Sequence, residues 1–283
     1  MRIIKRKNSH YVQHSFRKDG KIITREKYLG LKVPENIDIV KNKFLAECRK
    51  EAFYDVFEII KTKFNQEWKR LPPSAKEKMI QELSINFTYN TNAIEGSTIS
   101  EEETRDIVAH GIAPSKPLRD VKETEKHAEL FKKIFSEKQK ITKQSIIHWH
   151  NKLFSETKSD IVGKFRDYLV RVGDYRAPDW QDLNKLLDDF FRFQNSKNNM
   201  HTVEFAARVH YKFEKIHPFG DGNGRIGRLI MNSVLWDRGY PLLVIEYKKR
   251  KSYYKALRKD EEHFVQYFIR RYLAVHKRYL NKR

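Results

Sequence analysis

Residues 217–228 read HPFGDGNGRIGR and hold four of the chain's eleven glycines. Apolar residues then recur at helical spacing: Ile226, Leu229, Ile230, Val234 and Leu235. The glycine-rich loop therefore leads directly into an amphipathic helix. The first turn of a helix offers backbone N–H groups without intrahelical partners and the positive end of the helix dipole. A loop with few side chains lets an anion reach these groups, so the segment predicts a phosphate-binding site.

Four polar side chains of this segment predict its chemistry. Arg225 and Arg228 are three positions apart and share a helix face, so both guanidinium groups can bind successive phosphates. Asp221 is a lone carboxylate beside those phosphates, an arrangement that suits Mg²⁺. His217 precedes the loop and ionises near neutral pH, so it is the candidate general base for an attacking hydroxyl group.

Other interpretations of the glycines explain less. Gly222, Gly224 and Gly227 match the spacing of the dinucleotide-binding fingerprint, and residues 242–246 resemble a strand that ends in an acid. That fingerprint requires a strand before the loop, whereas residues 203–216 have helical spacing. The P-loop pattern GxxxxGK[ST] does not occur in the sequence. A glycine-rich turn before a solvated helix would explain the glycines but not the arginines, the acid and the histidine.

Composition and periodicity predict a mostly α-helical fold. Apolar residues make up 39% of the chain, while glycine and proline number only 11 and 8, which disfavours disorder and a turn-rich all-β fold. Helical spacing occurs at about residues 38–68, 74–96, 100–111, 119–138, 142–155, 183–191, 202–216 and 226–235, and within 247–283. Ser74 with Glu77, and Ser100 with Glu103, have the capping-box spacing. Hairpins are predicted at residues 10–31, around Asp19 and Gly20, and at residues 163–180.

The formal net charge of +21 predicts an acidic partner. Both ends of the chain are basic. Residues 1–27 hold nine basic and two acidic side chains, and residues 247–283 hold thirteen and three. Nucleic acid, a nucleotide, an anionic membrane surface and an acidic protein would each fit this charge.

Cysteine usage and hydropathy predict a cytoplasmic protein. Cys48 is the single cysteine, so neither an intramolecular disulfide nor a cysteine-based zinc site is available. No stretch of about 18 uncharged apolar residues occurs, and residues 1–6 lack the apolar core of a signal peptide. We expect a soluble protein without a membrane partner. His148 and His150 face different sides of a helix and make a poor metal pair, and His210 is interpreted as a surface or hydrogen-bonded core residue.

Segment 217–228 resembles the signature of Fic-domain proteins, HxFx[D/E]GNGRxxR, at every fixed position. The resemblance covers about residues 80–280. It implies a Fic-type helical bundle in which the motif joins two central helices, and Mg²⁺-dependent transfer of AMP from ATP to a Ser, Thr or Tyr hydroxyl group of a protein. His217 would be the base, Asp221 would bind Mg²⁺, and Phe219 would anchor the loop. The phosphate-binding residues implied by the resemblance are Gly222, Asn223 and Gly224 for the α- and β-phosphates, Arg225 for the β-phosphate and Arg228 for the γ-phosphate.

Residues 91–96, TNAIEG, are similar to the inhibitory motif [S/T]xxxE[G/N] of the same family. The motif precedes the catalytic core, so the resemblance implies an inhibitory helix at about residues 75–96. In it, Glu95 and Thr91 would hold Arg228 and block the γ-phosphate. An arginine that is paired with a carboxylate cannot also bind a phosphate.

Two further segments resemble parts of the family's nucleotide and target sites. The hairpin at residues 163–180 resembles the flap, which binds a segment of the target protein as an added strand. Tyr253 and Tyr254 resemble an aromatic position near the adenine, and core packing explains them equally well.

Together these expectations define three regions and one activity. Residues 1–33 are a basic N-terminal hairpin segment, residues 34–110 a helical region with the inhibitory helix, and residues 111–283 the Fic catalytic core. The expected activity is that of a protein adenylyltransferase that also modifies itself and is autoinhibited by Glu95. Two alternatives stay open: removal of AMP from a modified protein at the same site, and a basic nucleic-acid-binding module with a regulatory nucleotide site. The sequence is compatible with an oligomer.

Overall fold

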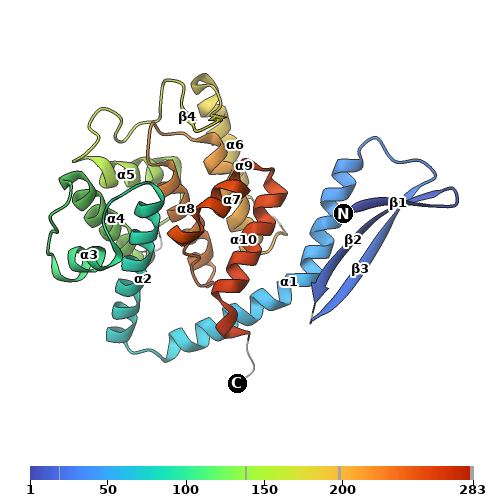
Figure 1. Cartoon of the computed structure of the whole chain (residues 1–283), viewed down its shortest axis with the longest axis horizontal. Coiled ribbons are helices and arrows are strands. Elements are labelled where there is room, and N and C mark those ends of the chain that lie inside the picture. Colours follow the sequence, from blue (N-terminus) through green and yellow to red (C-terminus); the bar gives the residue numbers. More distant parts are fainter. Residues whose placement is uncertain (19, 138, 197–198, 281–283) are drawn as a thin grey trace. The chain divides into compact units, whose positions relative to one another are not determined.

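The computed structural model describes residues 1–18, 20–137, 139–196 and 199–280. Most of these residues are helical, and the strands form two small antiparallel sheets, so the predicted mostly α-helical fold is confirmed (Figure 1). The chain divides into two compact units, Met1–Lys63 with Tyr279–Arg283, and Phe64–Arg278. Helix α1, Ile37–Arg70, is one continuous helix that contributes residues to both units.

The first unit is built on a three-stranded antiparallel sheet. Its strands follow chain order: β1 (Arg2–Arg6), β2 (Ser9–Lys18) and β3 (Lys21–Gly30). One face packs on α1, where Val12 is buried with Phe44 and Cys48. The predicted hairpin at residues 10–31 is confirmed, and β1 is an additional strand. Gly20 has the expected positive φ of 79°, whereas Asp19 of the predicted turn lies outside the described residues.

The second unit is helical. Its longer helices are α2 (Pro73–Ile94), α4 (Leu118–Glu137), α5 (Lys143–Phe154), α6 (Leu183–Asn195), α7 (Thr202–Ile216), α8 (Asn223–Asp237), α9 (Arg250–Arg258) and α10 (Glu261–Val275). The short turns are α3 (Glu101–Arg105), η1 (Asp106–His110), η2 (Trp180–Asp182), η3 (Tyr247–Lys249) and η4 (Lys277–Tyr279). Helices α7 and α8 pack against each other, with α6 and α10 on α7 and with α2, α4 and α5 on α8. The buried α7–α8 pair therefore carries the segment that joins them (Figure 1).

The helix starts were predicted with mixed success. The capping box of Ser100 and Glu103 is present. The one predicted for Ser74 is wrong, because α2 begins at Pro73 with Pro72 as its N-cap and no side-chain cap. Proline has a helix-compatible φ and no N–H group to satisfy, so the helix begins before Ser74. α2 ends at Ile94, and Gly96 turns the chain away with a φ of 91°.

Two segments with strand-like patterns hold less β-structure than their sequences suggest. The hairpin within residues 163–180 consists only of β4 (Arg171–Val172) and β5 (Tyr175–Arg176). Residues 242–246 form no strand, because the Asn232 side chain bonds both the N–H and the carbonyl group of Leu243. The dinucleotide-binding interpretation is therefore excluded. Among the described residues, no helix has the length and apolar character needed to cross a membrane.

Candidate active site

The glycine-rich segment connects α7 to α8. α7 ends at Ile216, and His217 takes a left-handed conformation with φ 51° and ψ 60°, which is uncommon for a residue other than glycine. Gly222 is the N-cap of α8 with φ 79°, and a Cβ atom there would collide with the ring of Phe154. The left-handed conformations of His217 and Gly222 turn the chain sharply at both ends of the loop. They place His217 close to the first turn of α8, whose N–H groups have no intrahelical partners.

The geometry around His217 fixes which ring nitrogen is free. Its Nδ1 lies 3.4 Å from the carbonyl oxygen of Glu214. A carbonyl only accepts hydrogen bonds, so Nδ1 carries the proton and Nε2 is the basic nitrogen. Burial lowers the pKa of His217 below its usual value, which keeps the ring neutral at pH 7. A neutral imidazole with a free Nε2 is the form required of a general base.

Aromatic stacking anchors the loop. The Phe219 ring is fully buried and stacks on His150, with 4.1 Å between the ring centroids. His150 Nε2 lies 3.1 Å from the carbonyl oxygen of Asp221, and its Nδ1 accepts from the N–H of Gly163. Burial lowers the pKa of His150 to about 4, so the ring stays neutral. The Asn223 side chain also bonds both backbone groups of Phe219.

Arg166 ties the segment before β4 to the motif loop. Its guanidinium group donates to the carbonyl oxygens of His217 (2.8 Å), Tyr168 (2.9 Å) and Pro178 (2.7 Å). The hydroxyl group of Tyr175 on β5 donates to the carbonyl oxygen of Lys215 at 2.6 Å. Two carbonyl groups of the segment after residue 163, those of Tyr168 and Pro178, are thus bonded to Arg166 instead of to a neighbouring strand.

A chain of alternating charges surrounds Asp221. The Lys158 ammonium group lies 2.6 Å from the Asp221 carboxylate and 3.1 Å from the Glu123 carboxylate. Burial opposes ionisation of both acids, but Lys158 and Arg225 outweigh it and hold the pKa of Asp221 and of Glu123 at about 2. Arg225 is buried, pairs with Glu123 and lies over the ring of Phe154. Asp221 is therefore a carboxylate at neutral pH and already has a cation beside it.

Arg228 pairs with Glu95. Its guanidinium group is 1% exposed, donates to the Glu95 carboxylate, and also bonds the carbonyl oxygen of Thr91 at 3.3 Å. A Cβ atom on Gly224 would collide with the Glu95 carboxylate. The acid at the end of α2 thus covers the first turn of α8, where the phosphates are expected.

The two tyrosines occupy different surroundings. Tyr253 is 1% exposed and lies behind Arg228, with its hydroxyl group 2.7 Å from His210 Nε2. Tyr254 lines a cavity of about 260 Å³. Only Tyr254 of the two is therefore placed to touch a ligand in that cavity, and His210 is a hydrogen-bonded core residue as interpreted.

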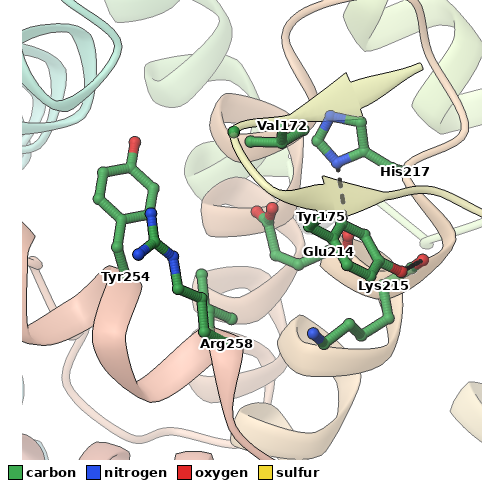
Figure 2. A pocket seen from close by; sticks show the side chains of 9 residues that line it. Val172, Tyr175, Glu214, Lys215, His217, Tyr254 and Arg258 are labelled. Carbon is green, nitrogen blue, oxygen red and sulfur yellow. Dashed lines mark hydrogen bonds between the residues drawn. The ribbon is translucent and has the colours of Figure 1, made fainter.

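The cavity lies between α9, the strands β4 and β5, and the end of α7. Its other lining residues are Val172, Gly173, Tyr175, Glu214, Lys215, His217, Leu257 and Arg258. Figure 2 shows Tyr254 and Arg258 on one side, His217 on the other, and the Glu214 carboxylate between them. Burial raises the pKa of Glu214 to about 7. A second, polar cavity of about 220 Å³ is lined by Glu95, Arg119, Glu123 and Arg225, among others.

The residues fit a magnesium ion only in company with a phosphate. Within the part of the chain that the structure describes, no group of three His, Cys, Asp or Glu side chains could hold a metal. Asp221 offers one ionised, half-exposed carboxylate. Mg²⁺ commonly takes one or two carboxylates, phosphate oxygens and several waters, so this single carboxylate fits it.

Sequence patterns missed four residues of this site: Glu123, His150, Lys158 and Arg166. Glu123 carried one usable signal, because it shares the buried face of α4 with His127 and Leu130, and a charged residue on such a face needs a partner. For Lys158 and Arg166, which lie in irregular segments, the periodicity of the sequence gave no comparable signal.

Comparisons with known proteins agree with the motif. The model of the Fic/DOC family matches residues 140–235. A protein of Nematostella vectensis named protein adenylyltransferase Fic is 34% identical over 201 residues, which are 69% of this chain and 47% of that protein. A protein of the same name in Drosophila ananassae is 33% identical over 201 residues, which are 67% of this chain and 39% of that protein. The chain thus spans about half or less of the length of these curated relatives.

Solved structures share the fold. Fic-1 of C. elegans (residues 134–508) superposes with a TM-score of 0.72 at 24% identity, covering 89% of this chain and 79% of that one. A Fic-domain signalling protein of Bacteroides thetaiotaomicron has a TM-score of 0.65 at 24% identity and covers 79% and 97%.

Proposed function

Because the chain contains a Fic domain and belongs to the Fic/DOC family, we propose that it is a protein adenylyltransferase that moves AMP from ATP to a protein hydroxyl group. The observation that carries the proposal is His217, a neutral imidazole with a free Nε2 on the wall of a cavity beside the start of α8. The names of the relatives support the same reaction.

The proposed reaction is a displacement at the α-phosphorus of ATP. Nε2 of His217 takes the proton of the target hydroxyl group, whose oxygen forms a bond to the α-phosphorus. The bond from that phosphorus to the bridging oxygen breaks, and pyrophosphate leaves. The N–H groups at the start of α8, with Gly222, Asn223 and Gly224, would bind the phosphates, and Arg225 would carry positive charge to the β-phosphate.

Asp221 is the proposed ligand for magnesium. The ion would neutralise phosphate charge and orient the leaving pyrophosphate. Asp221 is held in place by the His150 bond to its own carbonyl oxygen, and its carboxylate is ionised far below neutral pH. Mg²⁺ binding at Asp221 would therefore require only that the Lys158 ammonium group move away from this carboxylate.

Glu95 is the proposed inhibitor. Its carboxylate occupies Arg228, which would otherwise bind the γ-phosphate, and covers Gly224 in the first turn of α8. Thr91 contributes its carbonyl oxygen to the same arginine. ATP can bind in this state only with its terminal phosphate misplaced, so transfer is slow until Glu95 moves away.

The target and the base of the nucleotide would bind at different walls of the cavity that His217 lines. The exposed hairpin of β4 and β5 would take a target segment as an added strand. Tyr254 and the apolar part of the cavity would bind the adenine.

The division of the chain into residues 1–33, 34–110 and 111–283 stays part of this proposal. We also propose a cytoplasmic setting, because the single cysteine, Cys48, is buried and free, as is usual in a reducing compartment.

The test uses ATP labelled separately at the α- and γ-phosphates. The wild type, Glu95→Gly, Glu95→Gly/His217→Ala and the control Glu102→Gly are incubated with Mg²⁺ and each label. We expect α-label on the Glu95→Gly protein and little on the other three, since Glu102 is an exposed acid of α3. γ-Label on the protein would mean a phosphotransferase. Absence of α-label on Glu95→Gly, with ATP binding intact, would contradict the proposed function.

A further inference from the structure

The sheet of the first unit has a second face that the proposed function does not use. Strand register places alternate residues of β1, β2 and β3 on each face. The face opposite α1, here called the outer face, carries Arg2, Ile4 and Arg6 of β1, Tyr11, Gln13, Ser15 and Arg17 of β2, and Ile22, Thr24, Glu26 and Tyr28 of β3. Tyr28 is 57% exposed, so this face is open to a ligand.

Four polar residues of the outer face, Arg2, Arg6, Gln13 and Glu26, form one hydrogen-bonded row, and Ser15 and Thr24 bond each other beside it at 2.8 Å. Arg6 binds the Glu26 carboxylate with both terminal nitrogens, at 2.9 and 2.7 Å. Gln13 donates to Glu26 at 2.6 Å and accepts from Arg2 at 2.7 Å. Arginine, glutamine, glutamate, serine and threonine are the side chains that recognise base edges in DNA. The outer face presents side chains of all these types on neighbouring strands.

The charge around this face fits a polyanion. Residues 1–33 contain ten lysines and arginines but only two acids. On the face toward α1, Arg25 and Lys27 are neutralised by Glu51 and Glu47. Among the described residues, by contrast, the structure gives no acidic partner to Lys7, in the turn after β1, or to Lys32, just after β3. These exposed cations lie at the border of the sheet, where phosphates of a bound duplex would pass.

We propose that the outer face of β1–β3 binds double-stranded DNA in the major groove. Neighbouring strands lie about 4.8 Å apart, so three strands span about 10 Å, and the major groove is about 12 Å wide. Arg2, Gln13 and Arg17 would contact base edges, and Lys7 and Lys32 would contact phosphates.

The geometry disfavours other nucleic acids. The major groove of an RNA duplex is too narrow and deep for side chains on a sheet to reach the base edges. Single strands bind by stacking bases on accessible aromatic faces. Here Tyr11 is covered by Arg6 on one side and by Tyr28 on the other, the two rings being tilted by 58°, so the pair offers no parallel platform.

The test measures binding of the full chain to a fluorescent DNA duplex of about 20 base pairs and mixed sequence, roughly two helical turns. Single-stranded DNA and duplex RNA of equal length are the comparison probes. We expect the DNA duplex to bind at least about tenfold more tightly than either, with affinity that falls steeply as salt rises. Equal affinity for duplex RNA, or no duplex binding at low salt, would overturn the proposal.

Paired variants locate the surface. Arg2→Ala/Arg17→Ala should weaken duplex binding at least about tenfold, because two base-edge contacts are lost. The control Arg270→Ala/Lys277→Ala removes two exposed charges from the second unit and should change affinity less than about twofold. Equal losses in the two double variants would overturn the proposal. The measurement needs no nucleotide, so its outcome is independent of the proposed transfer reaction.

Discussion

Arg228 and Arg225 lie one helical turn apart at the start of α8, and each is buried against a carboxylate that is held differently. Glu95 is the C-cap of α2, is followed by Gly96, and keeps 27% of its side chain exposed. Glu123 lies inside α4 with 7% exposed. Glu123 also contacts Lys158, Arg119 and Thr157. A carboxylate at a helix end can leave one arginine with little other loss, whereas Glu123 cannot leave without stranding several polar groups. We therefore expect the Glu95–Arg228 pair to separate readily and the Glu123–Arg225 pair to stay formed.

The largest expected effect is on stability. Glu123→Ala leaves Arg225 buried without its carboxylate, and such a loss lowers the free energy of unfolding by about 3–5 kcal/mol. Urea unfolding of the variant and the wild type measures it. The control is Glu82→Ala, which breaks the exposed pair with Arg105 and should have a far smaller effect. Equal losses would mean that Glu123 is not a structural ion-pair residue.

The next effect is on nucleotide affinity. Glu95→Gly frees Arg228 for a phosphate, so Mg·ATP should bind about tenfold more tightly or better, the gain of one charge-assisted contact. Glu95→Gln keeps the shape without the charge and should lie between. Calorimetry in a His217→Ala background measures affinity without turnover. An unchanged affinity of Glu95→Gly for Mg·ATP would contradict the idea that Glu95 keeps Arg228 from the phosphates.

A smaller effect concerns magnesium. Lys158→Met removes the ammonium group that lies 2.6 Å from Asp221, so less Mg²⁺ should be needed for ATP binding, by about threefold to tenfold. Titration of Mg²⁺ at fixed ATP gives the midpoint. The control Lys152→Met changes an exposed residue of α5 and should leave the midpoint unchanged. A higher midpoint in Lys158→Met would show that the lysine assists the metal.

The smallest effect is a pH dependence of stability with opposite sign for two buried acids. Burial raises the pKa of Glu214 to about 7, so the stability it contributes is complete below pH 4.5 and is lost as the pH rises through about 7. The pKa of Glu123 is held at about 2, so its contribution is complete above pH 4.5 and is lost as the pH falls toward 2.

Glu214→Gln tests that sign. The variant should lose less stability than the wild type between about pH 5 and about pH 8, measured as melting temperature at the two values. Parallel curves for both proteins would contradict the assignment of the raised pKa to Glu214.

The sequence predicted the parts of the molecule that depend on local patterns. Periodicity located the helices, and the motif located the loop between His217 and Arg228. The sequence could not predict the contact between Arg225 and Glu123, because the two residues are 102 positions apart and only tertiary packing brings α4 to α8. The length of β4 and β5 was overestimated because strand periodicity does not show that the Arg166 side chain bonds the carbonyl groups of Tyr168 and Pro178. Glu95 was found because a short motif marked it.

The most direct test of the two-pair account compares initial rates of AMP transfer for the wild type, Glu95→Gln and Glu123→Gln at equal Mg²⁺ and ATP. Both substitutions remove one negative charge beside one motif arginine. The account predicts a faster rate for Glu95→Gln, because Arg228 is freed, and a slower rate for Glu123→Gln, because Arg225 loses its position. Acceleration by both, or by Glu123→Gln alone, would contradict it.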